Sequence, residues 1–196
     1  LRPQSGAEAN IAGEWARAVG VEHVTLFWAG EKPKTGVQAA ARSARYKLLA
    51  AAVQAAGADA LFTAHNADDQ AETVFMRMKR RSGVRGMAAI PAVSQIAAGA
   101  GPPIALMRPL LAYRRHALRN FLVELGQPFI DDPSNDDANF ERVRVRQSLA
   151  AAEAAGGADI AALLARARKA RTERNRLDDA ERAAFAALDG RFHEWG

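Results

Sequence analysis

The sequence contains no cysteine among its 196 residues. This absence excludes disulfide bonds, thiolate metal sites and cysteine nucleophiles, and it fits a reducing compartment. The sequence also lacks a run of about 18 apolar residues, the length that a membrane-spanning helix needs, and it does not open with a signal-peptide pattern. We therefore expect a soluble, cytoplasmic protein with no membrane partner.

Arginine is abundant and unevenly distributed, while the net charge is only +5. The arginines gather between Arg77 and Arg85, between Arg108 and Arg119, and between Arg142 and Arg176. Clusters of this kind are typical of proteins that bind phosphate or nucleic acid. Solvated helix faces give the same pattern, so a single cluster does not decide between the two.

The first half of the chain alternates between helical and strand patterns. Helices are predicted over residues 5–19, 37–56 and 67–78, with apolar strands over 21–29 and 58–64. This alternation is typical of an α/β domain with a parallel sheet.

After residue 90 the pattern changes to two short strands around a Gly/Pro turn, followed by helices. A helix over 113–125 should carry Phe121 and Leu125 on one apolar face. Helices over about 141–155 and 159–188 follow a turn-rich loop. The last of these helices is charged and thinly apolar, which is typical of a linker or docking helix.

The stretch "TAHNADDQAETVFMRMKRR" places more acid at a helix start than dipole complementation needs. On the predicted helix over 67–78, Asp68, Asp69 and Glu72 lie nearly opposite the apolar face, and His65 lies at the helix mouth. Because Asp68 and Glu72 repel each other at a spacing of four residues, the cluster favours a bound cation. Either a hard metal ion such as magnesium or a substrate amine would fit.

Several segments together resemble the tRNA(Ile)-lysidine synthases, which are PP-loop ATP pyrophosphatases. The segments "HNADDQAETV" and "RRSGVRGMAAI" carry the resemblance, and "LRPQSGAEA", "GVQAAARSARYKLL", "RPLL" and "DDPSNDDANFERVRVR" extend it in the family's order over about 150 residues. The resemblance implies a PP-loop, Rossmann-like parallel sheet with flanking helices and a mostly helical extension. We expect a partial PP-loop domain over 1–110, a helical continuation over 111–155, and a docking or linker helix over 156–196.

The reaction that this resemblance implies is ATP-dependent and requires magnesium. The wobble cytidine of a CAU-anticodon tRNA(Ile) is adenylated, and free L-lysine then displaces AMP to form lysidine. By position in the motif, Asp69 and Glu72 are the candidates for lysine binding. His65 and Asp68 are the candidates for catalysis, and Asp68 is also a candidate magnesium ligand or a helix cap.

The resemblance also assigns roles to arginines. Arg42 and Arg45 share a helix face and are candidates for contact with ATP phosphate. Arg142 and Arg146 are four residues apart and also share a face, which suits ATP phosphate or the tRNA backbone. In the family pattern an asparagine stands where this chain has Val143.

Two further arginines are candidates for tRNA binding. Arg85 lies in the glycine-flanked stretch "RRSGVRG", where close approach to a phosphate is sterically easy. Arg144 lies between the two phosphate candidates in "ERVRVR".

The family's Ser-Gly-Gly-x-Asp-Ser phosphate loop does not occur in this sequence. We interpret the chain as a form that lacks the first two strands and this loop, and we expect it not to turn over ATP by itself. Another PP-loop enzyme, such as a tRNA thiolase, is a weaker alternative because thiolases use cysteine. A non-catalytic tRNA-binding module is a second alternative, and the oligomeric state, with a homodimer as one option, stays open.

Overall fold

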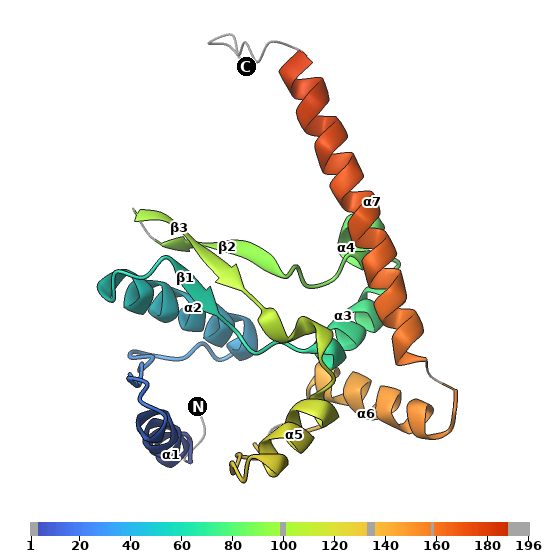
Figure 1. Ribbon diagram of the computed structural model, residues 1–196. Coiled ribbons are helices and arrows are strands. Elements are labelled where there is room, and N and C mark those ends of the chain that lie inside the picture. Colours follow the sequence, from blue (N-terminus) through green and yellow to red (C-terminus); the bar gives the residue numbers. More distant parts are fainter. Residues whose placement is uncertain (1–3, 99–100, 133–135, 158, 188–196) are drawn as a thin grey trace. The chain divides into compact units, whose positions relative to one another are not determined.

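The computed structural model describes residues 4–98, 101–132, 136–157 and 159–187 (Figure 1). Residues 133–135 of the predicted "DDPSNDD" loop therefore lie outside the described residues. The chain forms two compact units. The first comprises the described parts of Leu1–Thr63 with Val93–Met107, and the second comprises those of Ala64–Ala92 with Arg108–Gly196.

The first unit contains a three-stranded sheet in the order β1-β3-β2. Strand β1 (Ala60–Phe62) pairs parallel with β3 (Gly101–Met107), and β2 (Val93–Ala98) pairs antiparallel with β3. The sequence predicted a parallel sheet from strands over 21–29 and 58–64, whereas the parallel pair that the structure describes is β1 with β3. The described sheet as a whole is mixed, because β2 pairs antiparallel with β3.

Helix α2 (Val37–Ala55) packs on this sheet, as Figure 1 shows, and forms the core of the first unit. Ala50 and Val53 of α2 are buried against Ile104 of β3, with Leu61 and Ile96 packed around them. Gly36, with φ at +64°, begins the helix in a left-handed conformation that glycine adopts at low cost. The predicted helix over 37–56 is confirmed.

The predicted strand over 21–29 is wrong. Helix α1 (Ser5–Ala18) is followed by a segment that has no strand assignment. In it Val21, Val24 and Phe27 are 56%, 73% and 75% exposed. A strand requires a neighbouring strand for its backbone hydrogen bonds, and within the described residues no strand pairs with this segment.

The second unit is built around helix α3 (Ala67–Lys79). Helix α3 contacts α4 (Val84–Met87), the 3₁₀ helix η1 (Pro109–Ala112), α6 (Glu141–Ala154) and α7 (Ile160–Ala187). Its apolar core joins Ala71 of α3 to side chains of α6 and α7, namely Val145, Leu149 and Ile160.

Helix α7 packs on α3 and α4 with a thin apolar face (Figure 1). Ile160 and Ala167 are its buried residues. Arg85 of α4 adds ion pairs to Asp178 and Glu181 of α7. Among the described helices, none is both long enough and apolar enough to span a bilayer.

Helix α5 (Arg115–Glu124) is present where the sequence predicted it, but the described residues cover its apolar face only in part. Phe121 and Leu125, which the sequence placed on this face, are 57% and 63% exposed. The periodicity identified an amphipathic helix without identifying what packs against it.

Leu149→Ala should lower the free energy of unfolding by about 2–5 kcal/mol, because it removes a buried side chain that joins α3, α6 and α7. Urea unfolding followed by circular dichroism measures the change. Leu177→Ala is the matched control: Leu177 is 41% exposed, and its loss should cost about 0.5 kcal/mol or less. Equal losses for the two variants would contradict the described core.

Candidate functional site

The start of α3 is fixed by a capping box. The Asn66 side-chain oxygen accepts a hydrogen bond from the Asp69 backbone N–H at 3.1 Å. Asp69 Oδ2 accepts one from the Asn66 backbone N–H at 2.9 Å. Asparagine is a preferred N-cap because its side chain satisfies an amide that has no partner within the helix. The Asn-x-x-Asp spacing carried this information, and our sequence analysis missed it.

Glu72 is the centre of the site, and it is only 1% exposed. Its Oε1 accepts hydrogen bonds from Arg146 Nε at 2.8 Å and from Arg115 Nη2 at 3.3 Å. Its Oε2 accepts one from Arg142 Nε at 2.7 Å. Burial acts to raise the pKa of the Glu72 carboxyl, but the hydrogen bonds and charges of Arg146 and Arg142 outweigh it and hold the pKa below its ordinary value.

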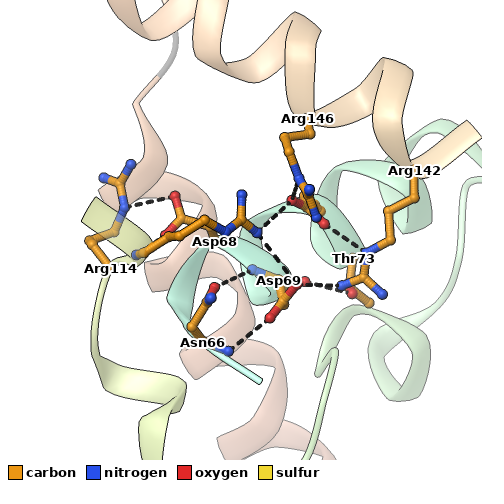
Figure 2. Close-up of polar contacts among 9 residues, drawn as sticks. Asn66, Asp68, Asp69, Thr73, Arg114, Arg142 and Arg146 are labelled. Atoms are coloured by element: carbon orange, nitrogen blue, oxygen red, sulfur yellow. Dashed lines mark hydrogen bonds and ion pairs between the residues drawn. The ribbon is translucent and has the colours of Figure 1, made fainter. Parts of the chain in front are cut away.

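Arg142 bridges two carboxylates of α3, and Figure 2 shows its contact with Asp69. Its Nη2 donates to Asp69 Oδ1 at 3.0 Å, while its Nε donates to Glu72. The Nη2 atom of Arg115 lies 3.7 Å from Asp69 Oδ1, so Arg115 also approaches the carboxylates of both Asp69 and Glu72. Asp69 therefore uses one oxygen for the helix cap and the other for guanidinium groups.

Asp68 ties α5 to α3. Its Oδ2 accepts a hydrogen bond from the Arg115 backbone N–H at 2.6 Å, at the N-terminus of α5. Its Oδ1 accepts one from Arg114 Nε at 3.1 Å (Figure 2). Arg114 also donates to both oxygens of Glu153 on α6, each at 3.0 Å. The pKa of Arg114 is raised, mainly by its hydrogen bonds to Glu153 and further by the negative charge of Asp68.

The spacing on α6 explains how two arginines reach one carboxylate. Arg142 and Arg146 are four residues apart and share a helix face, as the sequence predicted. Arg144 points elsewhere, and its Nη1 donates to the carbonyl oxygens of Ala138 and Asn139. Val143, where the family pattern has asparagine, is buried at 7% exposure.

A small pocket of about 80 Å³ lies beside this network. Asp68, Glu72, Arg115 and Arg146 contribute charged groups to its wall, and Leu149 and Ile160 contribute apolar ones. Asp69 and Arg142 are not among its lining residues. The pocket combines acidic, basic and apolar groups, which suits a ligand with a charged end and an aliphatic part.

His65 lies in the second unit and the two α2 arginines in the first. His65 is half-buried and directly precedes the Asn66 cap. Arg42 stacks on the Tyr46 ring at 5.0 Å, and Arg45 lies one turn away on the same helix. The structure therefore groups Arg142 and Arg146 with the acidic residues, and it describes Arg42 and Arg45 in a different unit.

The predicted tRNA contact Arg85 has 55% of its side chain exposed and is held by α7. Glu181 chiefly, and Asp178 as well, raise the pKa of the Arg85 guanidinium. Within the glycine-flanked stretch that carries Arg85, residues Val84–Met87 form the short helix α4.

The acidic groups do not form a metal centre of their own. Among the described residues there is no group of three or more His, Cys, Asp or Glu side chains arranged to hold a metal ion. Asp68, Asp69 and Glu72 each accept hydrogen bonds from guanidinium groups instead.

Sequence analysis missed three participants, which are Arg114, Arg115 and Glu153. The adjacent arginines of "YRRHALRN" directly precede a predicted helix, and this signal was available. Glu153 lies in an alanine-rich helix with nothing in its neighbourhood to single it out.

Glu72→Gln should lower the free energy of unfolding at neutral pH, and this difference from wild type should disappear in acid. Because the folded pKa of Glu72 is depressed, its stabilisation is fully present above the unfolded value of about 4.5 and disappears as the pH falls through the lower folded value. Urea unfolding of both proteins over a pH series tests this. Glu141→Gln, whose carboxylate is 48% exposed, should show little difference from wild type at any pH. A Glu72→Gln difference that persists unchanged in acid would contradict the ion-pair account.

Comparison with known proteins agrees with the motifs of this site. The model of the PP-loop domain family matches residues 1–153. A tRNA(Ile)-lysidine synthase of Bradyrhizobium sp. (strain BTAi1) is 44% identical over 190 residues, which is 96% of this chain and 52% of the relative. One from Rhodopseudomonas palustris is 40% identical over 191 residues, which is 96% of this chain and 54% of the relative.

The chain thus spans about half the length of these curated relatives. Their names confirm the resemblance to tRNA(Ile)-lysidine synthases that the sequence motifs indicated. Since the family model covers most of its length, the chain belongs to the PP-loop domain family.

Proposed function

We propose that this chain is part of an ATP-dependent ligase that joins the ε-amine of free L-lysine to C2 of the wobble cytidine in CAU-anticodon tRNA(Ile). The observation that carries the proposal is the carboxylate pair of Asp69 and Glu72. The pair lies at the start of a helix, is bridged by an arginine, and has a pocket beside Glu72. Family membership and the names of the relatives support this reaction.

The proposed reaction has two steps. In the first, the C2 oxygen of cytidine attacks the α-phosphorus of ATP, and pyrophosphate leaves. In the second, the lysine ε-amine attacks C2, and AMP departs with the oxygen. Adenylation makes this second step feasible, because it converts a poor leaving oxygen into a good one.

Lysine needs both capture and deprotonation. Its ammonium group would be held by Asp69 and Glu72, whose negative charges lie within reach of one bridging cation. Only the neutral amine attacks, so a nearby base must accept a proton, and we assign this role to His65 or Asp68. The hydrogen bonds of Asp68 to α5 also give it a positioning role.

The arginines are proposed to bind phosphate. Arg142 and Arg146 would serve ATP or the adenylate, because guanidinium groups pair with phosphate oxygens in two-bond geometry. Arg42 and Arg45 would contact ATP from α2. Magnesium is proposed to accompany the ATP phosphates and offset their charge, since the described carboxylates do not form a cluster that could hold it.

We propose that tRNA contacts involve Arg85 and Arg144. Both side chains are at the surface, and both have hydrogen-bond partners that fix their positions. A tRNA substrate fits a cytoplasmic location. A homodimer stays a prediction. A sulfur-transferring relative is disfavoured because the chain has no cysteine.

Asp69→Asn should lower kcat/KM for lysine at least about tenfold, or about 1.4 kcal/mol of transition-state binding. Lysine-independent adenylation of the cytidine should fall less, because Asp69 is proposed to contact lysine directly and to affect phosphate binding only through Arg142. The assay follows labelled lysine and pyrophosphate separately, using the whole reading frame that carries this sequence, ATP, magnesium and a CAU-anticodon tRNA(Ile) transcript.

The matched control is Asp131→Asn, which alters an exposed acid paired with Arg119. It should leave both steps unchanged. Equal losses in adenylation and lysine transfer for Asp69→Asn would show that Asp69 supports the fold and not the lysine site. Transfer of lysine to a transcript without the wobble cytidine would refute the proposed substrate.

A further inference from the structure

The charges around Glu72 balance within one connected cluster. Every member has an ion pair within the cluster, and the pairs run from α3 to α5 and α6. The cations are Arg114, Arg115, Arg142 and Arg146, and the anions are Asp68, Asp69, Glu72 and Glu153. With four of each, these eight described side chains are formally neutral as a set, so one added cation gives the set a net positive charge.

The pocket beside the cluster does not give a ligand access to both carboxylates. It has a volume of about 80 Å³, and Glu72 lines it whereas Asp69 does not. Glu72 is 1% exposed, and Arg142 lies between it and Asp69. A lysine ammonium can reach both carboxylates only if a guanidinium moves away from them.

Arg142 is the guanidinium best placed to move. Its side chain is 40% exposed, compared with 26% for Arg146 and 31% for Arg115. A displaced guanidinium needs a new anion, because an unpaired charge beside a desolvated site is costly. A polyphosphate offers oxygens that guanidinium groups bind in two-bond geometry.

We infer that an amine and a polyphosphate bind to this cluster with positive coupling, through an exchange of ion-pair partners. Arg142 leaves the carboxylates of α3 for the phosphate, and the lysine ammonium takes its place. Each ligand thereby releases the group that the other one needs. This inference rests on the proposed function, because it takes Asp69 and Glu72 as the lysine site.

The coupling is measured by isothermal titration of lysine into the protein, with and without saturating inorganic tripolyphosphate. Lysine should bind at least about tenfold more tightly when tripolyphosphate is present, which is within the usual range of coupling between sites. In the reverse titration, lysine should tighten tripolyphosphate binding by the same factor, because coupling between equilibria is reciprocal.

Two variants at Arg142 distinguish an exchange of ion-pair partners from a purely structural role of this arginine. Arg142→Gln removes the bridging cation, so lysine should bind more tightly than to wild type in the absence of tripolyphosphate, and the coupling should fall below about threefold. Arg142→Lys keeps the positive charge and should retain coupling. Arg176→Lys on α7, whose side chain is 76% exposed, is the control and should match wild type.

The outcomes are distinguishable. Equal lysine affinity with and without tripolyphosphate would overturn the exchange and leave the lysine site standing. Weaker lysine binding to Arg142→Gln in both conditions, with normal thermal unfolding, would also overturn it. Absence of lysine binding in every condition would refute the lysine site itself and, with it, the proposed function.

Discussion

The buried carboxylate of Glu72 is the interaction on which the second unit depends. A carboxylate that is 1% exposed cannot stay ionised at neutral pH without close cations. Arg115 comes from α5, and Arg142 and Arg146 come from α6, so neutralising Glu72 requires both helices to lie against α3. The apolar cluster around Leu149 then fills the space between α3, α6 and α7. Charge sets which elements meet, and apolar burial supplies much of the stability.

The three acidic residues at the start of α3 each have a different structural role. Asp69 completes the cap with Asn66, Asp68 satisfies the first amide of α5, and Glu72 collects guanidinium groups. Complementing the helix dipole alone would need only one acid. Asp69 and Glu72 are also the proposed lysine ligands, so this part of the chain combines structural and catalytic roles. Such positions trade stability against activity, because a ligand must compete with the pairs that hold the fold together.

Local patterns predicted the helices well, whereas long-range pairing was predicted poorly. The bounds of α2 and α6 followed from periodicity and from glycines near their ends, and those of α3 followed from periodicity alone. The segment over 21–29 has a strand-like composition, yet composition does not supply the neighbouring strand that it needs. Phe121 makes the same point for a helix: its spacing indicates an apolar face, and 57% exposure shows that the described residues cover it only in part.

The sequence predicted the acidic residues of the site, but it did not predict which arginines pair with them. The motif pointed to Asp69 and Glu72, and helical spacing placed Arg142 and Arg146 on one face. That this face meets Glu72 could not be read from spacing, since the partners are 70 and 74 residues apart. The requirement for charge neutrality predicts which faces pair, and residue spacing does not. An acidic face and an arginine-rich face on two helices of one unit each favour a counter-charge, so each is the simplest partner for the other. Exchange of those partners then becomes the natural way for ligands of both signs to enter.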